Sequence, residues 1–153
     1  MSKISDVYDA LQTAVATLLP TYIRLPNPYD PDFNPNLSME KGFGIGLSPA
    51  VNSERLLGCQ VSIERVFNVI LVNQIHSFDN DAEKLGDLEK SIMEDQYKLV
   101  EALEKDATIN SERNTVKYQS DGGIEFLVPK EENIRSRYFL VESSFVAEYF
   151  QPI

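Results

Sequence analysis

The most regular pattern in the chain is an alternation of apolar and polar side chains over residues 57–76. Every second residue from Leu57 onward lies on one face, and this face is apolar except at Arg65 and Asn73. A period of two predicts a β-strand. The other face begins polar and becomes apolar from Val66 onward, so the second half of the strand should be covered on both faces. A strand of about 18 residues spans roughly 60 Å, so it must bend near Arg65 or project beyond the core as one arm of a long hairpin.

Two segments show the spacing of amphipathic helices, with apolar residues at i, i+3, i+4 and i+7. The first covers residues 2–19 and ends at Pro20, which cannot continue a helix. The second covers about 25 residues from Asp81, after Asn80, which matches a capping box with Glu83. Its buried stripe is predicted to consist of Leu85, Leu88, Ile92, Gln96, Leu99 and Leu103, with Val100 beside it.

Residues 42–47 alternate glycine with an apolar residue, which is typical of a strand whose glycine face is closely approached by another backbone. A phosphate-binding loop is the alternative, but neither a helix start nor a glycine-lysine-serine or glycine-lysine-threonine sequence follows these glycines. Nucleotide binding is therefore not expected. Residues 49–55 are interpreted as a turn or short flexible loop that leads into the long strand.

The C-terminal part predicts a hairpin and a second long strand. The hairpin joins residues 115–119 to residues 124–128 through Ser120-Asp121-Gly122-Gly123, and residues 138–150 alternate again as a plausible partner for the first long strand. The whole order predicts an α+β fold, with two helices packed on one side of a mainly antiparallel β-sheet with long strands. With 153 residues, 42% of them hydrophobic, we expect residues 1–153 to form a single domain.

Residues 20–40 combine five prolines with asparagine and aspartate, which is the composition of a long loop. This loop also holds Leu25, Tyr29 and Phe33, and a free linker would not tolerate so many apolar and aromatic residues. We therefore expect the proline-rich loop to pack on its own domain or to contact a partner.

Charge and composition narrow the function classes. The chain has 24 acidic and 14 basic residues, a formal charge of −10, which argues against a surface that grips nucleic acid. Residues 81–106 alone hold nine acids and four lysines, interpreted as a solvated helix face with ion pairs. No long apolar run and no leader pattern occur, so we expect a soluble, unsecreted protein without a membrane partner. The single cysteine, Cys59, is expected to be a buried thiol in a reducing cytoplasm.

Candidate catalytic and metal-binding residues are few. His76 is the only histidine, and no histidine pair or cysteine cluster has the spacing of a transition-metal site. Asp79, Asn80, Asp81 and Glu83 lack the spacing and central glycine of a calcium loop and are interpreted as helix caps. Ser143 and Ser144 lie in a strand without a nucleophile elbow. We expect no enzymatic activity, no metal and no cofactor.

The order and size of these elements resemble the tail terminator proteins of long-tailed bacteriophages, the lambda-like group and its contractile-tail relatives. The resemblance rests on the helix that ends at Leu18-Leu19-Pro20, on Glu64-Arg65-Val66-Phe67-Asn68-Val69 in the long strand, on the helix from Asp81, and on the final Phe145-Val146-Ala147-Glu148-Tyr149-Phe150. It implies a virion protein of the tail or neck, assembled in the host cytoplasm. Such a protein would form a homo-oligomeric ring of six copies, end tail-tube polymerisation, and contact the tail tube protein and the head-side connector or head-closure protein.

The residues agree with this structural role in three respects: a projecting β arm, an apolar loop and the lack of a catalytic site. An acidic lumen would also let DNA pass as cargo without binding. The candidate interface residues are Leu25, Tyr29 and Phe33 in the loop and Gln60, Ser62, Glu64 and Arg65 in the outer part of the long strand.

Ordinary surface or local packing is the alternative for each of these residues. Other function classes stay open: another phage neck or head-closure protein, a small non-enzymatic adaptor module, or a small enzyme that depends on His76 or Glu64.

Overall fold

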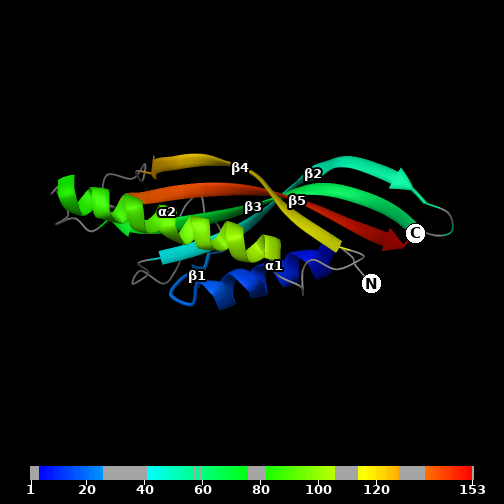
Figure 1. Cartoon of the computed structure of the whole chain (residues 1–153), viewed down its shortest axis with the longest axis horizontal. Helices are drawn as coiled ribbons and strands as arrows, with labels where there is room; N and C mark the ends of the chain where they lie inside the picture. Colours follow the sequence, from blue (N-terminus) through cyan, green and yellow to red (C-terminus); the bar gives the residue numbers. More distant parts are fainter. Residues whose placement is uncertain are drawn as a thin grey trace.

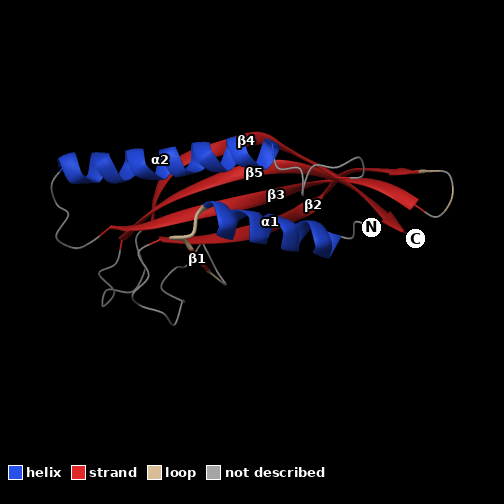
Figure 2. Ribbon diagram, turned by 60° about the horizontal axis from the view of Figure 1, so that its bottom comes forward, coloured by secondary structure: helices blue, strands red, loops and turns tan. Residues whose placement is uncertain are grey.

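The computed structural model of the chain describes residues 4–25, 41–56, 58, 60–75, 82–105, 114–127 and 137–152. These residues form two helices and a five-stranded sheet (Figure 1). The helices are α1 (Ile4–Leu18) and α2 (Ala82–Lys105), and the strands are β1 (Ile23–Arg24), β2 (Lys41–Arg55), β3 (Gln60–Ile75), β4 (Asn114–Leu127) and β5 (Arg137–Pro152). Both helices lie on one side of the sheet (Figure 2), so the predicted α+β architecture is confirmed.

The strands β3 and β5 form the centre of the sheet, whose order is β1-β2-β3-β5-β4. They pair antiparallel from Gln60 opposite Pro152 to Ile75 opposite Arg137, without a register shift. Their other neighbours, β2 and β4, are also antiparallel, and only the two-residue β1 runs parallel to its neighbour. The two long strands predicted from alternation are therefore present, and they are direct partners.

The main core lies between the helices and the face of β3 that carries Phe67, Val69 and Leu71. Phe145 of β5 is opposite Phe67 and is fully buried, and its ring meets Tyr118 of β4 edge to face at a centroid distance of 5.9 Å. The helices bury the stripes that their spacing predicted, which include Val7, Leu11, Val15, Ile92, Leu99 and Leu103. Burial of these stripes is what fixes the helices on this face, because short helices gain most of their stability from packing.

A smaller apolar cluster lies on the opposite face of the sheet. It consists of Leu25, Ile70, Val72, Tyr138 and Leu140. Ile70 and Val72 alternate with the core residues of β3, so the inner half of this strand is buried on both faces, as its sequence predicts.

The prediction of a turn at residues 49–55 is wrong, because these residues form the outer half of β2. Two register shifts, between Leu47 and Ala50 and between Ala50 and Asn52, place an extra residue in β2 each time. Such β-bulges on an outer strand accommodate Pro49, which has no N–H for the ladder. A Cβ added to Gly46 would meet Asn68 only at an ordinary contact distance of 3.7 Å, so the expected close backbone approach is absent at that glycine.

The predicted hairpin at residues 115–128 is also wrong, because β4 continues through Ser120-Asp121-Gly122-Gly123 as one strand paired with β5. The turn-forming residues instead make a bulge. Asp121 holds it, since its carboxylate accepts hydrogen bonds from the Gly123 amide at 3.0 Å and from the Tyr118 hydroxyl at 2.6 Å. The second of these bonds raises the pKa of Tyr118 above its ordinary value.

Replacement of Gly123 by alanine should lower the free energy of unfolding by about 1 kcal/mol, because a φ of 74° is unfavourable for a residue with a Cβ. Gly122→Ala is the matched control, since Gly122 has no positive φ and neither position has an atom within 4 Å of an added Cβ. Urea denaturation of both variants provides the measurement. Equal losses in the two variants would contradict the assigned bulge.

Candidate interaction surfaces

Three of the predicted contact residues in β3 share one face of the sheet. Because side chains alternate along a strand, Gln60, Ser62 and Glu64 point to the face without helices, whereas Arg65 points to the helix side. Gln60 is exposed, and the other three are half-buried. The four residues therefore do not form one surface, and Arg65 has to be considered apart.

Glu64 lies directly opposite Glu148 of β5 and opposite Asn52 of β2. Two carboxylates in this arrangement repel each other, because directly opposite Cβ atoms are only about 4.5–5.5 Å apart. The Ser62 hydroxyl donates a long hydrogen bond of 3.5 Å to Glu148 Oε1. Within the described residues no basic side chain forms an ion pair with Glu64 or Glu148.

Arg65 donates hydrogen bonds to two groups of its own chain. Its Nε donates to the Tyr149 hydroxyl at 3.2 Å, and its Nη1 donates to the Ser48 carbonyl oxygen at 2.9 Å. Arg65 thus connects the bulged part of β2 to β5 across β3, which is a structural role. The register shifts near this residue are in β2, while β3 stays paired with β5 and extends with β2 as a long hairpin, which was one of the two alternatives for the long strand.

The described part of the proline-rich loop packs on its own sheet. Leu25 is only 3% exposed, lies beside Ile70 and Tyr138, and donates its backbone N–H to the Phe43 carbonyl oxygen at 2.8 Å. Leu25 therefore belongs to the internal packing that was one of the two alternatives for this loop, and it offers little surface to a partner. The other loop candidates and the cysteine and histidine lie outside the described residues: Tyr29, Phe33, Cys59 and His76.

A polar seam connects the start of the sheet to α2. The Tyr22 hydroxyl donates to Asp95 Oδ2 at 2.7 Å, and Lys41 Nζ lies 3.7 Å from the same oxygen and 5.6 Å from the Tyr22 ring centroid. Burial raises the pKa of Tyr22 well above its ordinary value, and the bond to Asp95 adds to the rise. Asn73, fully buried near this hydroxyl, makes no hydrogen bond with the described residues through its amide. A buried amide without a hydrogen bond lowers the free energy of unfolding by about 1–3 kcal/mol. In the sequence, only the position of this polar residue on an apolar face indicates it.

A second buried polar pair fixes α2 on β5. Gln96 Nε2 donates to the Ser143 hydroxyl at 3.2 Å, and both residues are buried. The sequence assigned Gln96 to the apolar stripe and Ser143 to a strand, but the contact between them depends on how α2 sits on the sheet. An amide and an unactivated hydroxyl give this pair a packing role rather than a chemical one.

The helices also border a shallow groove. Its lining consists of Asp9, Ala10, Thr13, Ala14, Thr17 and Leu18 from α1 and Ala102 and Leu103 from α2. Within the described chain, no group of three or more histidine, cysteine, aspartate or glutamate residues is arranged to hold a metal ion. Neither of the described helices has the length and apolarity needed to cross a membrane.

Neither a protein-family model nor a curated protein sequence matches the chain. Its function has therefore to be inferred from the residues and the geometry.

Glu64→Gln is expected to raise the free energy of unfolding by about 0.5 kcal/mol at low salt, because it removes the repulsion with Glu148. The gain should shrink in high salt, which screens this repulsion. Urea denaturation at two sodium chloride concentrations measures both effects. Glu54→Gln is the control, since Glu54 is opposite Ser62 and its neutralisation should change stability less. A similar gain in both variants would point to net charge rather than to the Glu64–Glu148 pair.

Proposed function

We propose that the chain is a structural virion protein, a tail-terminator subunit that assembles into a ring. The ring would end polymerisation of the tail tube and provide the interface to the head-side connector or head-closure protein. Support comes from the order of elements, a helix, a long hairpin, a second helix and two further long strands, which includes the segments on which the sequence resemblance rests. The subunit would be located in the tail or neck of the virion, with no catalytic role.

The observation that carries the proposal is the length of the sheet relative to its helix layer. At about 3.3 Å per residue, the 16 residues of β3 extend roughly 53 Å. At 1.5 Å per residue, α2 with its 24 residues is about 36 Å long and α1 with 15 residues about 22 Å. The two helices are staggered along the sheet and overlap only where the C-terminal end of α2 lies beside α1 (Figure 2). The helix layer is therefore shifted along the sheet: α2 extends past one end, and the sheet projects beyond α1 at the other end.

Neither helix covers the projecting end, which is formed by the outer halves of β2 and β3 and the end of β5 (Figure 1). Its exposed residues include Ser53, Glu54, Arg55, Gln60 and Gln151. The first residue of β4 is opposite Tyr149, so β5 continues past the end of β4 without a further described strand beside it. Open strand edges of this kind are favourable for a subunit that buries them against other copies or against the tail tube.

Acidic residues occur on both faces of the molecule. The face without helices carries five glutamates and one lysine at register positions that share it, namely Glu54, Glu64, Glu125, Glu142, Glu148 and Lys117. On the other side, α2 has seven acids and four lysines. A ring would therefore surround its channel with negative charge in either orientation, and such charge would repel phosphates and let DNA pass as cargo.

Particles assembled without this chain should carry overlong tails that lack heads, because nothing would stop tube growth or provide a landing surface for the connector. Electron micrographs of these particles give the tail lengths directly. The purified chain should form a ring of about six copies with a central channel, measured by light scattering and negative-stain microscopy. Addition of the purified chain during assembly should restore tail length.

Two outcomes would overturn the proposal. Tails of normal length without heads would identify a head-closure protein instead. A monomeric or dimeric chain whose loss leaves particles unchanged would identify an adaptor outside tail assembly.

A further inference from the structure

Large apolar side chains are exposed at five described positions, and these lie along the two long margins of the sheet. They are Ile23, Leu47, Met93, Tyr97 and Phe126. Exposed apolar residues that gather on defined flanks, rather than scatter singly, indicate contact surfaces.

Met93, Tyr97 and Phe126 define the first surface, the α2–β4 margin. Phe126 is 52% exposed on β4, the last strand of the sheet. On α2, Met93 and Tyr97 lie on the same side of the helix as Glu104. The Glu104 carboxylate accepts a hydrogen bond from the Tyr118 amide of β4, so this side of α2 faces β4. The three side chains thus lie along the same flank, and Tyr97 is the most exposed of them at 66%.

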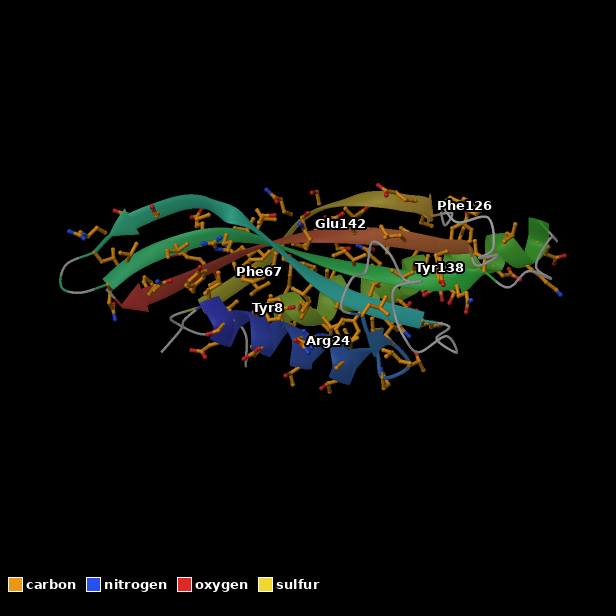
Figure 3. The ribbon with its side chains drawn as sticks, turned by 180° about the vertical axis from the view of Figure 1, so that it is seen from behind. Tyr8, Arg24, Phe67, Phe126, Tyr138 and Glu142 are labelled. Atoms are coloured by element: carbon orange, nitrogen blue, oxygen red, sulfur yellow. The ribbon has the colours of Figure 1, made fainter. Side chains whose placement is uncertain are left out.

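Ile23 and Leu47 lie along the second margin, the β1–β2 margin, on opposite faces of the sheet. Leu47 is opposite Phe67 on the helix side, whereas Ile23 lies on the face without helices. β1 closes the opposite side of the sheet but pairs only with Gly42 and Phe43. Beyond Gly42 and Phe43, no described strand pairs with the outer edge of β2. In Figure 3, Phe126 on β4 and Arg24 on β1 lie on opposite sides of the molecule.

The two margins differ in charge. β1 and β2 carry Arg24, Lys41 and Arg55 against a single acid, Glu54, whereas α2 and β4 together carry nine acids and five lysines. Lys41 already pairs with Asp95, but Arg24 and Arg55 form no ion pair with the described residues. In a chain with a formal charge of −10, the β1–β2 margin is locally positive and the α2–β4 margin is negative.

We propose that the α2–β4 margin of one copy docks on the β1–β2 margin of the next copy, and that this is the subunit contact of the ring. The inference rests on the proposed function. A ring requires a head-to-tail contact between two different surfaces of the same chain. The two margins meet this requirement, because they lie at opposite edges of one sheet, carry opposite charge, and each expose apolar side chains beside an outer strand. The occupant of each margin is a second copy of this chain.

Two variants that each block one margin test the contact. Tyr97→Glu and Leu47→Glu change exposed side chains, so circular dichroism should report an intact fold. By light scattering, each variant alone should lose the ring and have the mass of the 17.3 kDa monomer. An equal mixture should form dimers and nothing larger, because one intact margin of each kind remains in the pair. The double variant Tyr97→Glu with Leu47→Glu should stay monomeric and should form no dimer with either single variant.

Thr13→Glu is the matched control, since it adds the same charge at an exposed position of α1 that belongs to neither margin. Arg24→Glu probes the β1–β2 margin through charge alone and should weaken the ring most at low salt.

The outcomes separate the contact from the proposed function. Single variants that still form rings, a mixture that stays monomeric, or a control that fails like the margin variants would each overturn the margins as the contact. A wild-type chain that never forms a ring would overturn the proposed function itself.

Discussion

The pairing of β3 with β5 is the constraint on which the rest of the structure depends. The two strands match along their length without a bulge, so neither can shorten without leaving backbone groups of the other unpaired. Each of these strands is longer than either helix. The helices cover only part of one face of the sheet. The projecting end of the sheet follows from this mismatch.

Irregular pairing is confined to the strands that flank this centre. β2 and β4 each contain two register shifts, and each shift adds a residue that increases the local twist, so both strands can coil around a regular pair (Figure 1). Polar side chains support these places: Arg65 donates to a carbonyl oxygen of β2, and Asp121 accepts from the backbone of β4. Bulged edges are poor templates for unspecific pairing, so a contact at either edge depends on side chains as well as backbone.

Long patterns in the sequence predicted both helices, the two long strands, and the single face of the sheet on which the helices pack. Alternation and helical spacing are reliable signals when they repeat over many residues. The errors occurred where a short local signal opposed a long pairing partner. Asp121-Gly122-Gly123 has turn composition and Pro49 is a strand breaker, yet pairing along β5 and β3 outweighs both. The internal contacts of Leu25 and Arg65 could not be predicted, since they depend on how strands and loop meet, and a register change of one residue would reverse the face of every side chain.

Net charge and local charge act differently on a subunit of this kind. A chain with a formal charge of −10 repels its own copies, yet at physiological ionic strength the Debye length is about 8 Å and more distant charges are largely screened. Attraction then depends on the groups that face each other across a contact. Arg24 and Arg55 at one edge and the acids of α2 and β4 at the other would attract, while Tyr97 and Leu47 add apolar area that is buried on contact. In the proposed assembly, the same acidity would keep separate rings apart and still allow one ring to close.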